Sequence, residues 1–211
     1  MLLFITATDT GVGKTHTTLQ LLQIAHDLGY KAAAIKPIET GVLSSPEDGS
    51  KLLRKSQELN PNLKDITIDD VVSYRFSLPA APFVAKDTPI DLDYIKEKIA
   101  YLQSRCDILF VEGAGGLMVP IEKDYFMIDF IKDLDASALL VTPSKLGCIN
   151  QTLLSMEALQ NRGIPFWWYV NLYKDRDEYF KITHPFYEAY FKEVPLSLAS
   201  VFKRYTHANM A

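Results

Sequence analysis

The stretch that decides the fold lies near the start of the chain, where residues 8–15 read Thr8-Asp9-Thr10-Gly11-Val12-Gly13-Lys14-Thr15. An apolar run at residues 2–5 precedes it, and an amphipathic run at residues 16–28 follows it. Strand, glycine-bearing turn and helix, in that order, are the context in which a phosphate-binding P-loop works. The strict G-x-x-x-x-G-K-[ST] pattern fails at its first glycine, which is Thr8 here. The context still predicts a P-loop.

Each residue type in this loop suits polyphosphate. Glycine tolerates unusual backbone angles, so the N–H groups of Gly11, Val12 and Gly13 can point inward. The positive N-terminal end of the following helix adds to the attraction. Lys14 supplies a mobile cation for the β- and γ-phosphates, and the Thr15 hydroxyl is a usual Mg²⁺ ligand. A glycine turn that only capped a helix would leave Lys14 and Thr15 without a reason.

Composition narrows the class of protein. The chain has 211 residues, of which 48% are hydrophobic, so we expect one domain over residues 1–211 with a sizeable core. A net charge of −4 argues against non-specific nucleic-acid binding. No apolar run approaches the ~20 residues that span a bilayer, and the chain begins with an expected core strand rather than a signal peptide. We therefore expect a cytoplasmic protein without nucleic-acid or membrane partners.

The two cysteines, Cys106 and Cys148, are too few and too differently placed to indicate a disulfide framework. Cys106 lies two residues before the apolar run 108–111, and we expect it to be a small core residue. The sequence contains no cluster of cysteine and histidine with the spacing of metal ligands.

Apolar runs typical of strands alternate with helical patterns along the chain. We expect further strands at residues 31–38, with an end at Pro37, and at residues 71–76, 108–111, 138–141 and 165–170, and helices at 48–59, 91–105 and 148–161. Asp91 is the expected N-cap of its helix. The runs 108–111 and 138–141 lack alternation, as parallel strands covered on both faces do. The pattern predicts an α/β fold with an open, mostly parallel sheet and helices on both faces.

The polar residues that follow each strand carry the functional argument, because chemistry in an open α/β sheet collects at the carboxyl ends of the strands. They are Lys36, Glu39 and Thr40; then Glu112-Gly113-Ala114-Gly115-Gly116; then Thr142, Ser144 and residues 145–150; and finally Asn171. Candidate site residues are taken from these segments.

Glu112 ends an apolar strand, where an unpaired carboxylate is costly. A Mg²⁺ ion shared with Thr15 would satisfy it, and a salt bridge beside the glycine turn is the alternative. Lys36 is a cation at a strand end, which can be a solvated rim residue. Beside a P-loop it becomes a candidate for stabilising charge on a transferred phosphoryl group. Gly147 precedes an expected helix start that could hold a carboxylate or be an ordinary junction.

Four segments together resemble the dethiobiotin synthetases of biotin biosynthesis. They are residues 6–15, Lys36-Pro37, residues 111–116 and Lys145-Leu146-Gly147-Cys148-Ile149-Asn150, in the family's order. The last segment is not shared by P-loop proteins at large, and beyond Asn171 the resemblance is thin. The resemblance implies a P-loop NTPase fold of the nitrogenase-iron-protein and cell-division-ATPase type, and a homodimer.

The resemblance also implies an ATP-dependent carbon–nitrogen cyclo-ligase whose small-molecule partners are 7,8-diaminopelargonic acid, CO₂ or bicarbonate, and ATP, with Mg²⁺ as the metal. One amino group of the diamine would form a carbamate with CO₂, and the carbamate oxygen would attack the γ-phosphate. The other amino group would attack the resulting carbamic–phosphoric anhydride, close the ring and release phosphate.

Roles follow from the resemblance residue by residue. The catalytic residues would be Lys36, Lys14 and Thr10, and the metal ligands Thr15, Asp48 and Glu112. The nucleotide would contact Gly11, Val12, Gly13, Lys14, Thr15, His16, Asp48, Glu112, Gly113, Ala114, Gly115, Asn171 and Leu172, with Asn171 at the adenine edge. The substrate would contact Lys36, Thr40, Leu146, Gly147, Cys148 and Asn150, the last four across the dimer interface.

Three differences from the family pattern concern the residues expected to recognise the nucleotide or its base. Many members have Glu where this chain has Gly11, and the family usually has Asp where this chain has Leu172. The stretch after Asn171 is short, although Glu193-Val194-Pro195 is similar to the family's next strand-end segment near the base. These differences predict adenine recognition that is looser than is usual for the family.

Three other functions compete with this interpretation. A switch ATPase of the chromosome-partitioning or septum-placement type usually carries a second lysine, as in K-G-G-x-G-K-T, and no lysine lies between Met1 and Gly13. A glutamine-dependent amide ligase of the same superfamily needs a glutaminase with reactive cysteine and histidine, for which this chain has no room. A plain nucleotide-binding module is the third.

Overall fold

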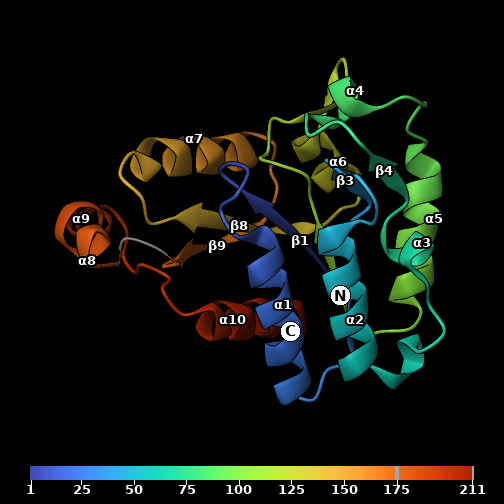
Figure 1. Cartoon of the computed structure of the whole chain (residues 1–211). Coiled ribbons are helices and arrows are strands. Elements are labelled where there is room, and N and C mark those ends of the chain that lie inside the picture. The colour runs from blue at the N-terminus through green and yellow to red at the C-terminus, as the bar shows by residue number, and fades with distance from the viewer. Residues whose placement is uncertain (174–175, 211) are drawn as a thin grey trace.

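The computed structural model describes residues 1–173 and 176–210 (Figure 1). Within these residues a five-stranded sheet has the order β2-β5-β1-β8-β9, and its pairings are parallel. Its strands are β1 (Leu2–Ala7), β2 (Ala32–Ile35), β5 (Ile108–Glu112), β8 (Ser137–Pro143) and β9 (Phe166–Asn171). The parallel strands run in one direction, so their carboxyl ends lie at one edge of the sheet.

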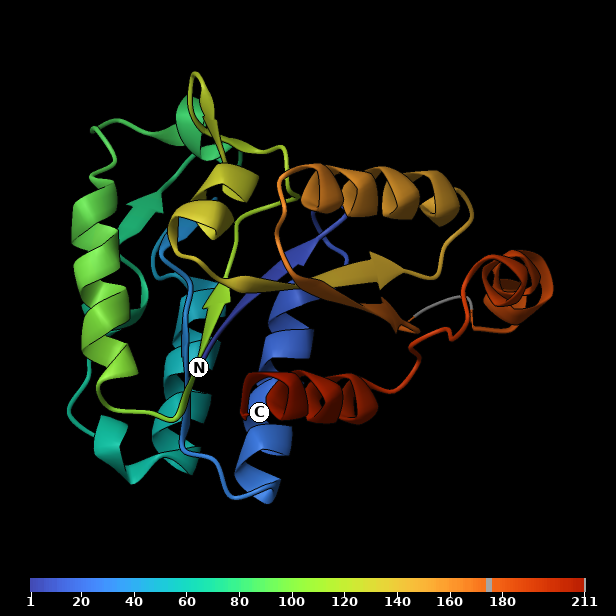
Figure 2. The same cartoon turned by 180° about the vertical axis from the view of Figure 1, so that it is seen from behind.

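Helices cover both faces of this sheet (Figures 1 and 2). One face carries α1 (Lys14–Asp27), α2 (Glu47–Leu59) and α10 (Leu198–Met210), and the other carries α5 (Leu92–Gln103), α6 (Met127–Asp133) and α7 (Cys148–Asn161). The central strands are therefore buried from both sides. Phe4, Phe110 and Leu140 are fully buried in this core, which is why their strands show no polar alternation.

Smaller elements surround the sheet. Beside β2 lie the parallel strands β3 (Ile38–Thr40) and β4 (Tyr74–Phe76), the 3₁₀ turn η1 (Pro61–Leu63) and α3 (Ile68–Val71). Next come α4 (Pro82–Ala85) and the antiparallel pair β6 (Pro120–Glu122) and β7 (Tyr125–Phe126). Beyond β9, α8 (Arg176–Glu178), the π-helical turn η2 (Tyr179–Thr183) and α9 (His184–Tyr190) form a knob at the edge of the molecule (Figure 1).

The predicted α/β class is confirmed, and two strand boundaries are corrected. The strand expected at residues 31–38 is broken at Lys36-Pro37, because proline has no N–H to give a ladder and disfavours regular continuation. The strand expected at residues 71–76 begins only at Tyr74, since Val71 ends α3. A carbonyl links the two corrected regions: Tyr74 donates its N–H to Pro37 O at 2.9 Å.

The expected cap of α5 is present. The Asp91 carboxylate accepts hydrogen bonds from the N–H groups of Asp93, at 2.9 Å, and Tyr94, at 3.1 Å. These bonds satisfy donors that the first turn of a helix leaves free. The helix expected at residues 91–105 accordingly begins at Leu92 and ends at Gln103.

Both cysteines are free thiols. Cys106 is partly buried at the foot of β5, and burial raises the pKa of its thiol to about 12. Cys148 is fully buried in a small second core with Val170, Tyr179 and Tyr187. In the described part of the chain, the helices are too short or too polar to cross a bilayer.

Candidate functional site

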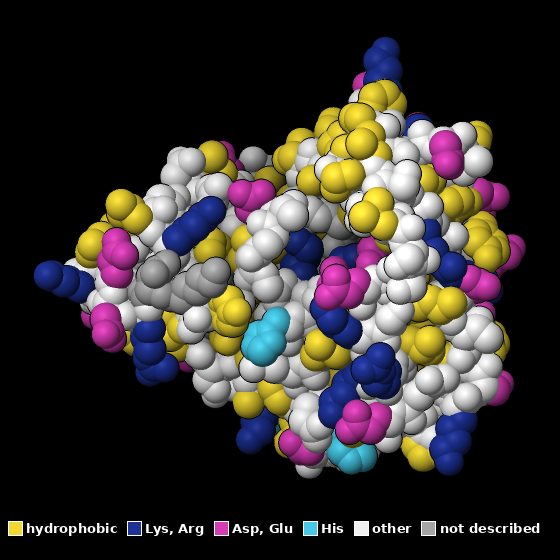
Figure 3. All heavy atoms as spheres, in the orientation of Figure 1, with side chains coloured by type: hydrophobic (Ala, Val, Ile, Leu, Met, Phe, Trp, Pro, Cys, Tyr) yellow, Lys and Arg dark blue, Asp and Glu magenta, His cyan; other side chains and the backbone are white. Residues whose placement is uncertain are grey.

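A cavity of about 790 Å³ opens at the carboxyl ends of β1, β2 and β5. In the orientation of Figure 1 it is a hollow near the middle of the molecule with dark blue side chains inside it (Figure 3), and the lysines that line it are Lys14 and Lys36. Its walls come from the loop before α1, from residues 38–45 and from residues 79–82. The ends of three strands, the glycine loop and two connecting segments therefore surround one cavity.

The loop that leads into α1 has the backbone of a P-loop. Gly11 has φ +73° and Gly13, the N-cap of α1, has φ +100°, values that residues with a side chain rarely adopt. A Cβ at Gly13 would lie 2.3 Å from the Asn171 amide nitrogen. That amide donates to the Val12 carbonyl at 2.9 Å. Asn171, at the end of β9, thus holds the loop, and its predicted contact with adenine stays a prediction.

Lys14 is the first residue of α1 and is buried beneath this loop. Its ammonium donates to the Asp9 carbonyl at 3.2 Å. Burial and then the nearby Lys36 cation lower the pKa of Lys14 to about 8, against the opposing pull of Glu112 and Asp48. A bound polyphosphate would favour its charged form, because opposite charges at close range raise the pKa of a lysine.

Three residues of the site form hydrogen bonds to Glu112. It ends β5 and is fully buried. Its Oε1 accepts from the Thr15 hydroxyl at 2.7 Å and from the Lys36 ammonium at 2.7 Å, and its Oε2 accepts from the Thr18 hydroxyl at 2.9 Å. An unpaired carboxylate at this buried strand end would be costly, and these three donors pair it.

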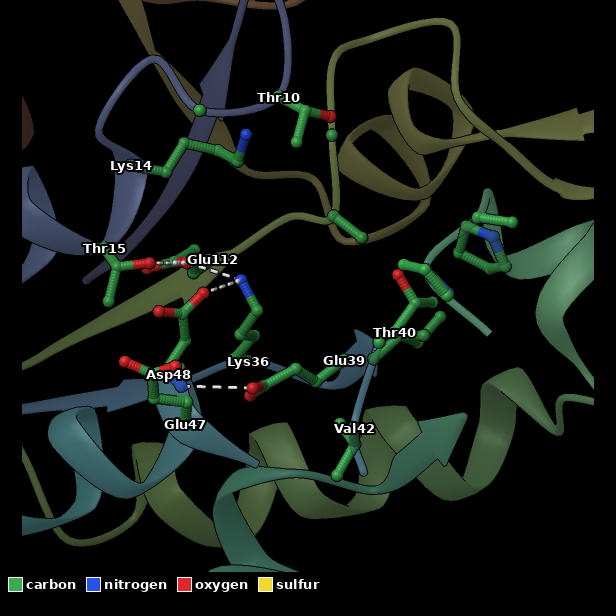
Figure 4. A pocket seen from close by; sticks show the side chains of 18 of the residues that line it. Thr10, Lys14, Thr15, Lys36, Glu39, Thr40, Val42, Glu47, Asp48 and Glu112 are labelled. Atoms are coloured by element: carbon green, nitrogen blue, oxygen red, sulfur yellow. Dashed lines mark hydrogen bonds and ion pairs between the residues drawn. The ribbon is translucent and has the colours of Figure 1, made fainter. Parts of the chain in front are cut away.

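Lys36 lies between two carboxylates (Figure 4). Besides Glu112, its ammonium lies 3.3 Å from Oδ2 of Asp48, near the start of α2. Burial alone would lower the pKa of Lys36, but Glu112 and Asp48 outweigh burial and raise the pKa above its ordinary value. The lysine is therefore a fixed positive charge inside the cavity. Its backbone lies in the break between β2 and β3.

The three residues predicted to ligate Mg²⁺ converge on one point. Thr15 and Glu112 are hydrogen-bonded, and Asp48 reaches the same region through Lys36. Within the described residues, no group of three or more His, Cys, Asp and Glu side chains is placed to hold a metal. Mg²⁺ usually binds one or two carboxylates and completes its shell with phosphate and water. A hydroxyl and two carboxylates beside a phosphate loop fit that preference.

Most of the predicted site residues line the cavity. Those that do are Thr10, Gly11, Gly13, Lys14, Thr15, His16, Lys36, Thr40, Asp48, Glu112, Ala114 and Gly115. Gly113 does not line the cavity. Its Cα faces the core, where a Cβ would lie 2.8 Å from the Phe4 ring. Val12, Asn171 and Leu172 also stand outside the lining of the cavity as the structure describes it.

The turn before α7 lies apart from the cavity of its own chain. Gly147 is the N-cap of α7 with φ +88°, and Leu146 is largely exposed. The Cys148 side chain is fully buried, with its sulfur 3.7 Å from the Tyr187 hydroxyl. The structure does not bring Leu146, Gly147, Cys148 and Asn150 together with Lys36, and only the backbone of Cys148 is left for a ligand.

Sequence reasoning assigned no role to two residues that contact the predicted site. Thr18 contacts Glu112 from α1, and its spacing of three residues from Thr15 on one helix could have pointed to a shared face. Glu39 was noted after the strand without a role. It accepts hydrogen bonds from the backbone of α2, and no local pattern in the sequence indicates that contact.

Comparisons with known proteins agree with this geometry. A family model described as an AAA domain matches residues 2–184. The ATP-dependent dethiobiotin synthetase BioD of Sulfurovum sp. (strain NBC37-1) is 54% identical, over 90% of each chain. The protein of the same name from Wolinella succinogenes is 42% identical, over 92% of this chain and 89% of its own.

Solved structures share the fold. The MinD cell division protein of Aquifex aeolicus is similar with a TM-score of 0.53 at 16% identity, over 92% of this chain and 79% of its own. A plasmid partition protein from Borrelia burgdorferi has a TM-score of 0.51 at 12% identity, over 87% and 84% of the two chains. These likenesses confirm the predicted fold of the cell-division-ATPase type. With its P-loop, its strand-end Lys36 and Glu112, and these close relatives along almost its whole length, the chain belongs to the ATP-dependent dethiobiotin synthetase family.

Proposed function

We propose that this chain joins CO₂ to 7,8-diaminopelargonic acid and closes the ring to dethiobiotin, with ATP converted to ADP and phosphate. The family gives the coarser activity, an ATP-dependent ligase of biotin biosynthesis. One observation supports the finer proposal most: two buried lysines, Lys14 and Lys36, enter one cavity from different elements beside the Thr15–Glu112 pair.

The P-loop would hold the triphosphate of ATP. Backbone N–H groups at Gly11 and Gly13, the N-terminus of α1 and the Lys14 ammonium all favour negative charge there. Thr15, Asp48 and Glu112 would hold Mg²⁺, which when bound neutralises phosphate charge. Catalysis would then rest on placing groups and stabilising charge rather than on a covalent enzyme intermediate.

The first chemical steps would take place beside Lys36. An amino group of the diamine adds to the carbon of CO₂ and loses a proton, which gives a carbamate. A carbamate oxygen then attacks the γ-phosphorus as the bond to ADP breaks. Lys36 is fixed and charged, so it can exchange its contacts with Glu112 and Asp48 for contacts with the carbamate and phosphoryl oxygens.

Ring closure would follow in the same cavity. The second amino group attacks the carbonyl carbon of the carbamic–phosphoric anhydride, the bond from carbon to the phosphate oxygen breaks, and phosphate leaves. The attacking nitrogen loses its proton as the cyclic urea forms. Thr10 in the loop and Thr40 at the end of β3, which both line the cavity, would orient the two ends of the reacting group.

The carboxylate end of the substrate would be held by a second copy of the chain. The turn at Gly147–Asn150 opens α7, and helix starts attract carboxylates. That turn lies apart from the cavity of its own chain, so a homodimer that places one turn at the mouth of the partner's cavity would complete the site.

A switch ATPase is the second candidate, because the fold is shared with MinD and a plasmid partition protein. The absence of lysine between Met1 and Gly13 weighs against it. Phosphate release, measured with and without diaminopelargonic acid and bicarbonate, separates the two. We expect release that requires both compounds. A rate indifferent to both would contradict the proposed reaction and favour the switch.

A further inference from the structure

Glu39 is a buried carboxylate that the proposed chemistry does not use. It lies in β3, lines the cavity and is 6% exposed. Its two oxygens accept hydrogen bonds from consecutive backbone N–H groups: Oε1 from Asp48 at 3.1 Å and Oε2 from Gly49 at 2.8 Å. These are the second and third residues of α2.

Helix α2 receives its cap from this distant side chain. The first N–H groups of a helix have no partner within the helix, and a carboxylate is the most favourable acceptor for them. The residue that precedes α2 is Pro46, whose side chain cannot accept a hydrogen bond. Glu39 accepts these hydrogen bonds instead. It lies in β3, and residues 41–46 connect β3 to α2. The cap therefore also closes this loop, most of which lines the cavity.

Close packing presses the start of α2 against its neighbours. A Cβ at Gly49 would lie 2.1 Å from Cγ2 of Val72 and 3.2 Å from Oε2 of Glu39. Only glycine lets the helix backbone approach this closely. The position of the helix start is thus set by the Glu39 carboxylate on one side and by the Val72 side chain on the other.

The capping of α2 by Glu39 determines where Asp48 lies. Its backbone N–H is held by Glu39, while its carboxylate lies 3.3 Å from the Lys36 ammonium, which in turn contacts Glu112 at 2.7 Å (Figure 4). The Asp48 side chain is 37% exposed, so packing alone leaves it room to move. That movement is limited by the hydrogen bond from its backbone N–H to Glu39 as well as by the ion pair with Lys36.

We propose that Glu39 is a positioning residue for the divalent-metal and phosphate site: by capping α2 it holds Asp48 where a cation bound beside Thr15 and Glu112 can be reached. The assignment rests on the proposed function in one respect, that Asp48 is a metal ligand. Groups that orient metal ligands typically change metal affinity by ~10–100-fold when they are replaced.

The test compares three variants in binding of Mn²⁺, as a paramagnetic stand-in for Mg²⁺, with a non-hydrolysable ATP analogue. Glu39→Gln keeps the size but turns an amide N–H₂ toward one backbone donor. Glu39→Asp keeps the charge but withdraws the oxygens, and it serves as the second variant if Glu39→Gln does not fold. Asp91→Asn is the control, because the Asp91 carboxylate also accepts from two backbone N–H groups at a helix start, that of α5, and Asp91 does not line the cavity.

We expect Mn²⁺ affinity to fall about tenfold in Glu39→Gln and severalfold in Glu39→Asp, and to stay within twofold of wild type in Asp91→Asn. In turnover, the Mg²⁺ concentration for half-maximal rate should rise about tenfold in Glu39→Gln, while kcat at saturating Mg²⁺ falls less than threefold. Thermal unfolding of all three variants measures their loss of stability independently.

Two results would overturn the assignment. One is Mn²⁺ affinity within twofold of wild type in both Glu39 variants. The other is an equal loss of affinity in Glu39→Gln and Asp91→Asn, which would mean that lost stability is the cause. Failure of the proposed reaction gives a different pattern: the wild type would bind Mn²⁺ and nucleotide but release no phosphate in response to diaminopelargonic acid and bicarbonate. The binding comparison would still decide the role of Glu39.

Discussion

The ammonium nitrogen of Lys36 lies 2.7 Å from Oε1 of Glu112, the same oxygen that accepts the Thr15 hydroxyl. A fully buried carboxylate and a buried lysine thus neutralise each other at the end of β5. A divalent cation on that carboxylate would take over the neutralisation and free Lys36 for the transferred phosphoryl group. Each residue of the pair therefore has a partner to exchange during turnover.

Replacing Lys36 by alanine should nearly abolish turnover while ATP still binds. Charge that develops during phosphoryl transfer would lose its stabilising cation, and loss of one such group typically costs ~10²–10³ in rate. Phosphate release and binding of an ATP analogue measure the two effects. Lys55→Ala, which removes a lysine paired with Glu58 on α2, is the control. A Lys36→Ala enzyme with more than half of wild-type turnover would remove Lys36 from the mechanism.

Mg²⁺ should raise the melting temperature of Lys36→Met more than that of the wild type. Removing one partner of a buried ion pair typically costs about 3–5 kcal/mol, because the other charge is left uncompensated. A cation bound at Glu112 and Asp48 would restore the balance and stabilise the folded form by mass action. Scanning calorimetry with and without Mg²⁺ tests this. Equal shifts in both proteins would show that Lys36 and the metal do not share these carboxylates.

Thr15→Val and Glu112→Gln should each raise the Mg²⁺ concentration required for activity, since the first removes a hydroxyl ligand and the second replaces a charged carboxylate by a neutral amide. Thr18→Val is a matched control: it contacts the same carboxylate through Oε2 but is not a predicted ligand. It should lower stability and leave the Mg²⁺ dependence as it was. Unchanged Mg²⁺ titrations for Thr15→Val and Glu112→Gln together would mean that other groups hold the metal.

The active form should be a symmetric dimer whose sites are completed by the partner's Gly147–Asn150 turn. Light scattering gives the mass. Complementation tests the shared site more sharply, because a heterodimer of Lys36→Ala and Asn150→Ala chains contains one intact site. Random mixing of the two inactive variants should restore about a quarter of wild-type activity. A fully active monomer, or a mixture that stays inactive although chains exchange, would contradict the shared site.

Adenine recognition should be looser than is usual for the family. The grip on phosphate depends on the loop, Lys14 and Mg²⁺, whereas base selectivity depends on residues from Asn171 onward. The Asn171 amide already donates to Val12, and Leu172 offers no side-chain acceptor. GTP and CTP should therefore support measurable turnover, with ATP preferred. A preference above about a thousandfold, which corresponds to ~4 kcal/mol, would show a fully built polar base site.

Several features of this protein were predictable from short stretches of sequence. The P-loop follows from glycines at positions of positive φ between an apolar strand and an amphipathic helix. The Asp91 cap and the buried strand 108–111 follow equally from local preferences. The end of the second strand near Lys36-Pro37 was predictable as well, because proline cannot donate to a ladder, although the strand ends at Ile35, two residues before Pro37.

Local conformational preference and periodicity therefore determined the P-loop, the main strands and helices α1, α2, α5 and α7, since these depend on contacts within a few residues. Helices α6, α9 and α10 and the pair β6 and β7 were not predicted from the sequence. Only the tertiary structure decided which side chains meet. Lys36 and Glu112, 76 residues apart, pair because β2 lies beside β5, and Asn171 reaches Val12 across 159 residues because both lie at the same edge of the sheet. Strand order arises from packing the whole chain, and so do the Glu39 cap of α2 and the convergence of Asp48 on Lys36.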